Sequence, residues 1–207
     1  GAGAQNGILI KNAEALEVLE EVDTIVVDKT GTLTEGKPRL ITVEPIAPLG
    51  AEELLLHAAS LEQGSEHPLA QAIVIGAKEK GVALKAVTNF QSITGKGVTG
   101  EIDQTKVMVG NQSLIGDSAL LVRAEVLRAE GQTVMFVSIN GKASGLIGVA
   151  DPIKATTDEA LKSLRSNRIK IVMLTGDSKT TAMAIGKKLG IDDIRAEVLP
   201  QDKFRIV

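Results

Sequence analysis

The sequence predicts an α/β protein in which a parallel-sheet domain is interrupted by a β-rich insert. Apolar strands alternate with helices from about Lys154 onward, and such alternation is typical of a parallel sheet. Short β runs broken by glycines fill the middle of the chain instead. Two turns, at residues 35–38 and at Asp151-Pro152, separate the two patterns. We therefore expect residues 1–37 and 149–207 to form one discontinuous domain and residues 38–148 to form the insert.

The composition limits the size of the protein and the kind of partner it can bind. The 207 residues suffice for one large domain or two small ones, and the hydrophobic fraction of 43% suffices for a core. A net charge of -3 without a basic block argues against nucleic acid as a partner. The absence of cysteine excludes disulfides and thiolate ligands, and two histidines argue against a transition-metal site. Without a signal-peptide pattern or an apolar stretch of roughly 18 to 20 residues, we expect a soluble chain.

One helix and one strand precede the first turn. A helix is expected from Asn12 to about Glu20, because its apolar side chains share one face. Val22–Val27 is a short apolar run that is typical of a buried strand. Beyond residues 35–38, a strand near Arg39–Val43 would begin the insert.

The insert is expected to hold helices, glycine-rich β runs and a hairpin. Pro68 suits the first position of a helix, and Asn140-Gly141 predicts a type I′ turn. The expected helices cover residues 49–60, 68–80 and 121–129, and the expected strands cover residues 87–93, 98–102, 106–109, 133–139 and 143–149.

Helices and strands alternate regularly beyond Asp151-Pro152. Ile169–Leu174 is an expected strand, with one helix before it at residues 154–167 and one after it at residues 178–189. A short strand is expected near Ile194–Ala196 and a last helix from about residue 200. These strands and the strand before Asp28 should form one parallel sheet.

Asp28 follows its apolar strand directly and begins the string Asp-Lys-Thr-Gly-Thr-Leu-Thr. A carboxylate at the exit of a strand is both exposed and rigidly held. Gly31 lets the backbone bend and approach a bound group, and the N–H groups of the loop could bind an anion. Such a site suits an aspartate that accepts a phosphoryl group covalently. The alternative is a buried strand that ends in a polar turn, with Asp28 as a turn or capping residue.

A second polar turn, Thr175-Gly176-Asp177, follows the strand at residues 169–174. Ligands of open α/β sheets bind at the carboxyl ends of strands, where Thr175 could donate to a phosphoryl oxygen. The alternative is an ordinary strand-to-helix turn with Asp177 or Ser178 as N-cap. Lys203 could neutralise a phosphoryl group as a point charge, or it could be a solvated helix-surface lysine.

The insert carries its own candidate residues. His67 lies just before an expected helix and could contact an anion or a base, or it could be a plain loop histidine. Gly95 and Gly97 form a Gly-x-Gly pair, and Gly110-Asn111 follows a β run. On their own, these glycines are equally compatible with ordinary turns.

Taken together, these motifs resemble the P-type ATPases. The string at residues 28–34 is the phosphorylation motif of that family, and Ser-Glu-His-Pro-Leu at residues 65–69 resembles the nucleotide-domain signature of its heavy-metal-transporting branch. Lys203 stands in a matching Pro-x-x-Lys context. The resemblance extends from residue 7 to Lys203 and is closest to the copper/silver and zinc/cadmium/lead pumps.

The resemblance implies a haloacid-dehalogenase-like (Rossmann-like) parallel-sheet domain with an inserted α+β nucleotide-binding domain built on an antiparallel sheet. Asp28 would attack the γ-phosphorus of ATP, and Mg²⁺ near Asp28 and the Thr30 carbonyl would neutralise phosphate charge. The family's phosphoryl-transfer residues map onto Asp28, Lys29, Thr30, Thr175, Gly176, Asp177 and Lys203. Its nucleotide-binding residues map onto Glu62, His67, Gly95, Gly97, Gly110 and Asn111.

The family also has parts that this sequence lacks. A Gly-Asp-Gly-x-Asn-Asp motif that helps to hold Mg²⁺ would lie downstream of Lys203, and the sequence stops at Val207 before it. The membrane helices and the actuator domain, which would be partners in the same parent chain, are absent as well. We expect a fragment from the cytoplasmic side of an integral membrane pump for a heavy-metal cation, foremost copper. It should bind adenine nucleotide but phosphorylate Asp28 poorly.

Two other functions are compatible with the sequence. A phosphatase of the same superfold would carry a second aspartate two positions after the nucleophile, where this chain has Thr30. Threonine cannot serve as a general base at neutral pH, so it favours a longer-lived acyl phosphate. The other possibility is a module that binds nucleotide without catalysis.

Overall fold

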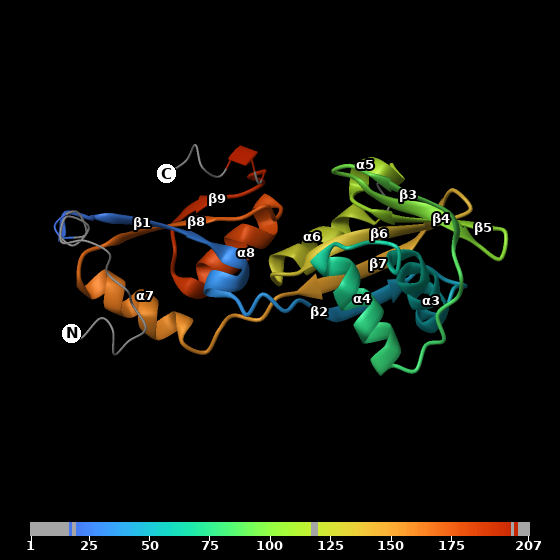
Figure 1. The fold of residues 1–207 in the computed structure, drawn as a ribbon, viewed down its shortest axis with the longest axis horizontal. Coiled ribbons are helices and arrows are strands. Elements are labelled where there is room, and N and C mark those ends of the chain that lie inside the picture. Colours follow the sequence, from blue (N-terminus) through green and yellow to red (C-terminus); the bar gives the residue numbers. More distant parts are fainter. Residues whose placement is uncertain (1–16, 18–19, 117–119, 200, 203–207) are drawn as a thin grey trace.

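The computed structural model describes residues 17, 20–116, 120–199 and 201–202. Figure 1 shows an elongated molecule with a small parallel sheet at one end and a larger antiparallel sheet at the other. No helix in these described ranges has the length and apolar character needed to cross a membrane. The expected helix from Asn12 and the helix expected from residue 200 lie largely outside the described residues.

The parallel sheet has three strands in the order β1-β8-β9, and both strand pairs are parallel. Its core joins Met173 of the central strand to Leu161 of one helix and Ile185 of another, all of them buried. This part comprises β1 (Thr24–Asp28), α7 (Thr157–Ser166), β8 (Lys170–Leu174), α8 (Lys179–Leu189) and β9 (Asp193–Arg195).

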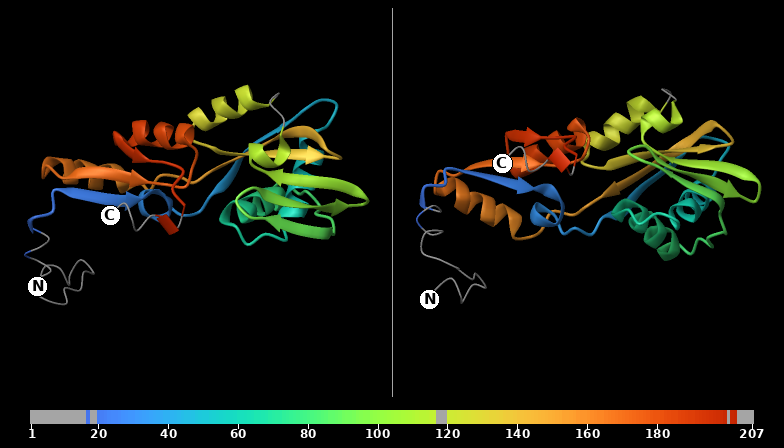
Figure 2. Two further views of the ribbon diagram at one scale, coloured as in Figure 1. Left: turned by 90° about the horizontal axis from the view of Figure 1, so that it is seen from above. Right: turned by 45° about the horizontal axis from the view of Figure 1, so that its top comes forward.

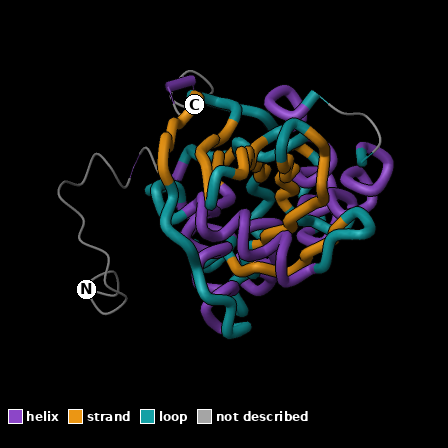
Figure 3. Tube along the Cα trace, turned by 90° about the vertical axis from the view of Figure 1, so that its right-hand side faces the viewer, coloured by secondary structure: helices purple, strands orange, loops and turns teal. Residues whose placement is uncertain are grey.

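The antiparallel sheet has six strands in the order β2-β7-β6-β5-β4-β3. Residues of β6 alternate between its faces: Val137 packs with the helices α3 and α4, whereas Phe136 packs with α6. In the end-on view of Figure 3, the strands accordingly lie between helices. This part comprises β2 (Arg39–Pro45), α3 (Ala51–Glu62), α4 (Pro68–Glu79), β3 (Thr88–Ile93), β4 (Gly97–Ile102), β5 (Thr105–Gly110), α5 (Gln112–Ile115), α6 (Leu121–Ala129), β6 (Thr133–Ile139) and β7 (Lys142–Ala150).

The predicted fold class is confirmed, and most predicted elements agree with the structure within a few residues. Asn140 and Gly141 have φ values of 50° and 77°, as the predicted type I′ turn requires. The predicted start of α7 was wrong: the helix begins at Thr157, because the Lys154 N–H is donated to Leu33 O in the crossing between the sheets. The four-residue helix α5 was missed, since one turn has no measurable periodicity. The chain positions that bound the two domains stay a prediction.

Two neighbouring segments of the chain, around Thr34 and around Ile153, connect the two sheets. Thr34 and Ile153 form an isolated antiparallel bridge, and the Glu35 N–H is donated to Pro152 O at 2.8 Å. The carboxylate of Asp151 accepts from the Thr34 hydroxyl at 2.5 Å and from the Gly36 N–H at 3.2 Å. Its other oxygen accepts from the Lys37 N–H at 3.0 Å. Asp151 therefore holds the crossing together, as suits the turn expected at Asp151-Pro152.

Candidate functional site

The sheet register brings the two predicted polar turns together. Asp28 is the last residue of β1 and lies opposite Leu174, the last residue of β8. Thr175-Gly176-Asp177 follows Leu174 immediately. Because β1 and β8 are parallel, both turns leave the sheet at the same carboxyl edge, where ligands of such sheets bind.

The loop after Asp28 is closed on itself by hydrogen bonds. Thr34 donates its N–H to Lys29 O at 3.1 Å, and its buried hydroxyl lies 3.0 Å from the same oxygen. The Gly31 N–H is donated to Thr34 Oγ1 at 3.2 Å. Gly31 has a φ of +77°, and no atom lies within 4 Å of where its Cβ would be. The result is a fixed turn whose tip, Thr30 to Thr32, remains exposed to a ligand.

Lys29 and Asp177 form a nearly buried ion pair across the two turns. Lys29 Nζ lies 2.6 Å from Asp177 Oδ2, and the two side chains are 9% and 15% exposed. The contact lacks the alignment of a hydrogen bond, so it is chiefly a Coulombic contact. Asp177 Oδ1 accepts from the hydroxyl of Thr133, which begins β6 in the other sheet. The residue type at 133 carried no signal in the sequence, and only the fold reveals this partner.

Next to Asp28, Thr175 provides a hydrogen-bond donor and Gly176 provides open space. Thr175 is 2% exposed, and its Oγ1 accepts from the Asp177 N–H at 3.1 Å. Since its oxygen accepts there, its hydroxyl proton can be donated to an incoming oxygen. Gly176 is exposed, and a Cβ there would lie no closer than 3.5 Å to its neighbour Val198 O.

The residue that caps α8 is Ser178, one of the two alternatives for this turn. Its Oγ accepts from the Thr181 N–H at 3.3 Å. Asp177 is therefore not engaged as the cap and faces Lys29 instead. The N-terminus of an eleven-residue helix also lies beside the carboxyl edge of the sheet, and it favours negative charge there.

Four of the predicted nucleotide residues gather at one end of the β4–β5 hairpin. Gly97 pairs with Gly110 in register, and a Cβ on either residue would lie 2.2 Å from a backbone oxygen. Asn111 donates its side-chain N–H to Gly95 O at 2.8 Å and its backbone N–H to Lys96 O. The Gly-x-Gly pair is thus a close backbone contact and not a loose turn.

Glu62 and His67 lie at the two ends of the α3–α4 connection. Glu62 is 6% exposed, and burial raises its pKa to about 7, although a hydrogen bond with Ser65 opposes the shift. His67 is the N-cap of α4: its Nδ1 accepts from the Leu69 N–H at 3.2 Å. This bond fixes the ring and leaves Nε2 for another partner.

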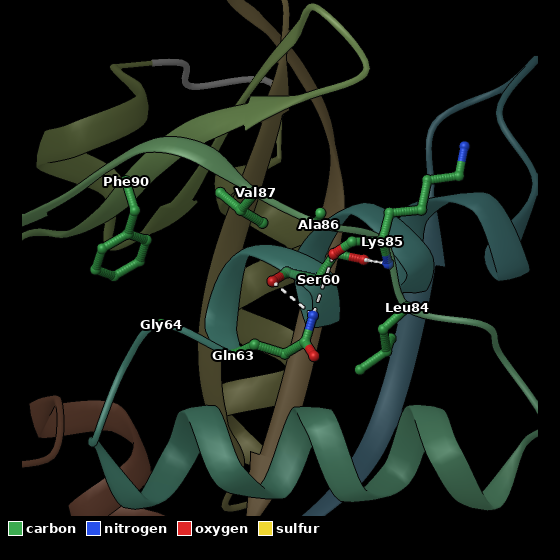
Figure 4. A pocket seen from close by; sticks show the side chains of 8 residues that line it. All are labelled: Ser60, Gln63, Gly64, Leu84, Lys85, Ala86, Val87 and Phe90. Atoms are coloured by element: carbon green, nitrogen blue, oxygen red, sulfur yellow. Dashed lines mark hydrogen bonds between the residues drawn. The ribbon is translucent and has the colours of Figure 1, made fainter.

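A pocket of about 440 Å³ lies beside this connection (Figure 4). The Phe90 side chain stands over Gly64, where a Cβ would come within 2.8 Å of the ring. The Gln63 side chain donates to Ser60 O at 3.3 Å and to Lys85 O at 3.2 Å. It therefore links the end of α3 to the segment before β3, and both of these line the pocket. None of the predicted nucleotide residues lines the pocket, which is bounded by Ser60, Gln63, Gly64, Leu84, Lys85, Ala86, Val87 and Phe90.

Phe90 lines the pocket from the strand next to the one that begins with Gly97. Phe90 belongs to β3, which pairs with β4. Ile93 of β3 lies opposite Gly97 of β4. Phe90 is not among the predicted nucleotide residues, although it is one of only three aromatic residues in the chain. That scarcity was the available signal, because a ring in an otherwise aliphatic chain can stack on a base.

Lys203 lies outside the described residues, so the structure does not place it. Within the described ranges, no group of three or more histidine and acidic side chains could hold a metal ion. The turn itself offers the Asp28 carboxylate and main-chain carbonyls, of which Lys29 O and Gly31 O already accept from Thr34 and Lys154. Mg²⁺ accepts such a set, because it usually keeps several waters and takes one or two carboxylates together with substrate phosphates.

Comparisons with known proteins agree with this geometry. The family model for haloacid dehalogenase-like hydrolases matches residues 22–207. The whole chain is 49% identical to a silver exporting P-type ATPase of Salmonella typhimurium, over 26% of that protein. It is 52% identical to a copper-exporting P-type ATPase of Legionella pneumophila, over 29% of that protein. The chain therefore spans about a quarter of the length of the curated relatives it matches.

Solved structures show the same arrangement. A zinc-transporting PIB-type ATPase in its E2.Pi state superposes with a TM-score of 0.75 at 36% identity, covering 100% of this chain and 34% of that one. The catalytic CPx-ATPase domain CopB-B superposes with a TM-score of 0.71 at 32% identity, covering 98% of this chain and 72% of that domain.

Proposed function

The chain belongs to the haloacid dehalogenase-like hydrolases, and from this membership we propose that it is the ATP-binding and phosphorylation part of a heavy-metal-transporting P-type ATPase. The observation that carries the proposal is the position of Asp28. Its phosphorylation motif leaves β1 at the sheet edge where Thr175 and Gly176 leave β8. Copper or silver is the proposed ion, because relatives named for those ions are about 50% identical to the chain.

The proposed reaction is an in-line transfer of the γ-phosphoryl group. A carboxylate oxygen of Asp28 forms a bond to the γ-phosphorus while the bond to the β,γ-bridging oxygen breaks, and ADP leaves with that electron pair. No general base is needed, since a carboxylate attacks in its ionised form. Thr175 would donate to a phosphoryl oxygen, Gly176 would let that oxygen approach the backbone, and Lys203 would supply positive charge.

The residues beside Asp28 fit Mg²⁺. The Asp28 carboxylate and the Thr30 carbonyl are hard oxygen donors on an exposed turn, which is the ligand type that Mg²⁺ prefers. When bound, Mg²⁺ neutralises the negative charge that the phosphate oxygens carry during transfer. Lys29 is proposed to supply positive charge next to Asp28, where its ion pair with Asp177 holds its ammonium group in place.

Thr30 favours this function over a phosphatase of the same fold. It is exposed on the Asp28 loop, at the position where such a phosphatase needs a second carboxylate. Without a base there to activate water, the aspartyl phosphate would persist. A persistent phosphoenzyme is what a pump needs in order to couple phosphorylation to ion movement.

ATP is proposed to bind the insert through the hairpin glycines and the α3–α4 connection. The close contact of Gly97 with Gly110 fixes the backbone at this end of the hairpin, where Gly95 and Asn111 are exposed to a nucleotide. The neutral form of Glu62 could donate a hydrogen bond to the base, and His67 Nε2 is available at the same connection. The site would consist of Glu62, His67, Gly95, Gly97, Gly110 and Asn111.

In the parent pump, the chain would lie on the cytoplasmic side of the membrane. Its partners would be ATP, an actuator domain of the same polypeptide, and a cation that crosses through membrane segments outside this sequence. These assignments follow from the named relatives, of which the chain covers only about a quarter.

Nucleotide titration of matched variants tests the proposal. His67→Asn keeps a side chain that can cap α4 and removes the imidazole, so ATP affinity should fall by about tenfold, or about 1.4 kcal/mol. Asp28→Asn should change ATP affinity by no more than about twofold, because the nucleotide is held by the insert. His57→Ala, on α3, is the control and should leave affinity unchanged. Equal losses in the His67 and Asp28 variants would contradict the assignment of the two sites.

A further inference from the structure

The insert contacts the half of the protein that carries Asp28 through α6 and through a short segment at the start of β6. There α6 and α8 lie next to each other, where the two halves of the molecule meet (Figure 2). The segment is residues 130–133, which link the end of α6 to β6. Through Thr133 it reaches Asp177, which is also the partner of Lys29 beside Asp28.

Backbone contacts fix this segment on α8. The buried hydroxyl of Thr181 is donated to Gln132 O at 2.9 Å, and Lys188 Nζ donates to Glu130 O at 2.9 Å. Between them, Gly131 has a φ of +93°, and a Cβ there would lie 2.9 Å from Ile185 Cδ1. The positive φ favours glycine at residue 131, where the segment turns against α8, so the place of Thr133 beside Asp177 depends on how the insert docks on α8.

The two oxygens of Asp177 are divided between the two halves of the protein. Oδ2 lies 2.6 Å from Lys29 Nζ, whereas Oδ1 accepts from Thr133 Oγ1 at 3.3 Å. The Thr133 bond is long for a hydroxyl donor, so a small opening of the interface would break it. In a nearly buried setting, loss of that donor also changes how the carboxylate faces Lys29, because little water can replace it.

We propose that Thr133 is a positioning residue for the phosphorylation loop. Its hydroxyl orients Asp177, and Asp177 in turn holds Lys29 next to Asp28 when the insert is docked on α8. The nucleotide-carrying insert would thereby set the geometry of the loop that receives the phosphoryl group. The inference rests on the proposed function for its purpose, but the coupling itself is a property of the protein without nucleotide.

Nuclear magnetic resonance of the complete chain tests the coupling. The readouts are the Asp177 carboxyl carbon and the Lys29 Nζ signal, with Asp177→Asn used to assign the first. Thr133→Val preserves the shape of the side chain and removes the donor, so it should shift both signals. Thr133→Ser restores the hydroxyl and should return both signals toward their wild-type positions.

Two further variants separate coupling from a local disturbance. Gly131→Ala leaves the side chains of Thr133 and Asp177 intact but strains the positive-φ turn that seats the segment on α8, and it should shift both signals in the same direction as Thr133→Val. Thr180→Val removes a different bond of the same interface, to Glu125 at 2.7 Å, and should leave both signals in place. Unchanged Lys29 and Asp177 signals in Thr133→Val would overturn the proposal.

ATP titration of the same proteins distinguishes this inference from the proposed function. If the wild-type chain fails to bind ATP while Thr133→Val still shifts the Lys29 signal, the proposed function fails and the coupling stands. If ATP binds and the signals stay in place, the coupling fails alone.

Discussion

The sheet edge around Asp28 and the hairpin end around Gly97 are built by opposite means. Around Asp28, side chains from distant segments hold the geometry: Lys29 meets Asp177, and Asp151 clamps the crossing at Thr34. In the insert, backbone meets backbone at Gly97 and Gly110, where side chains are excluded. The first region should therefore be sensitive to lost charge and the second to added volume.

The largest expected effect concerns the buried ion pair. Lys29→Met keeps the apolar stem and leaves Asp177 as a buried carboxylate without its cation, so the free energy of unfolding should fall by about 3–5 kcal/mol. Lys85→Met is the matched control: its pair with Asp103 is 47% and 69% exposed, and such pairs contribute at most about 1 kcal/mol. Chemical denaturation followed by circular dichroism measures both. Similar losses in the two variants would show that burial at Lys29 has no special importance.

A pH-dependent effect of intermediate size is expected in the insert. Folded Glu62 keeps its proton up to about pH 7, whereas the unfolded chain releases it near the ordinary pKa of 4.5. The folded protein binds the extra proton between these values, so this group's contribution to stability falls as the pH rises from 4.5 to 7, by about 3 kcal/mol in all.

Glu62→Gln removes that titration. Its free energy of unfolding, measured relative to wild type, should increase across pH 4.5 to 7 and level off above pH 7. Glu66→Gln, an exposed neighbour, is the control and should follow the wild type. A difference between Glu62→Gln and wild type that does not vary with pH would contradict the raised pKa.

The smallest of these effects tests the backbone contact. Gly97→Ala places a Cβ 2.2 Å from Val109 O at a φ of +147°, so it should destabilise the protein by about 2–3 kcal/mol. Gly95→Ala, two residues away, has open space around its Cβ and a φ of +70°, so it should cost only about 1 kcal/mol. Thermal unfolding compares the two. Equal costs would mean that conformation, and not the contact with Gly110, requires glycine at residue 97.

Local patterns were sufficient for much of the fold and for the meeting of the two polar turns at one sheet edge. The strands before Asp28 and Thr175 could be predicted as short apolar runs, and the parallel pairing followed from their alternation with helices. β8 is buried, whereas β1, expected to be buried, is only half-buried because it lies at one edge of the described sheet. Asn140-Gly141 fixed a hairpin for the same local reason, since two positive φ values need those residue types. The helix α5 and the late start of α7 were not predictable, because one depends on a single turn and the other on a contact with Leu33.

The sequence by itself predicted Asp28 as the nucleophile, placed glycines at positions of positive φ, and determined at which strand ends the polar turns lie. Each of these is set within a few residues by periodicity and backbone sterics. Only the tertiary structure decided that Asp177 pairs with Lys29, that Thr133 reaches Asp177 from 44 positions away, and that Asp151 is committed to a residue 117 positions before it. Partners of charged and polar groups are chosen by the register of sheets and the docking of helices, because an ion pair depends on distance in space and not along the chain.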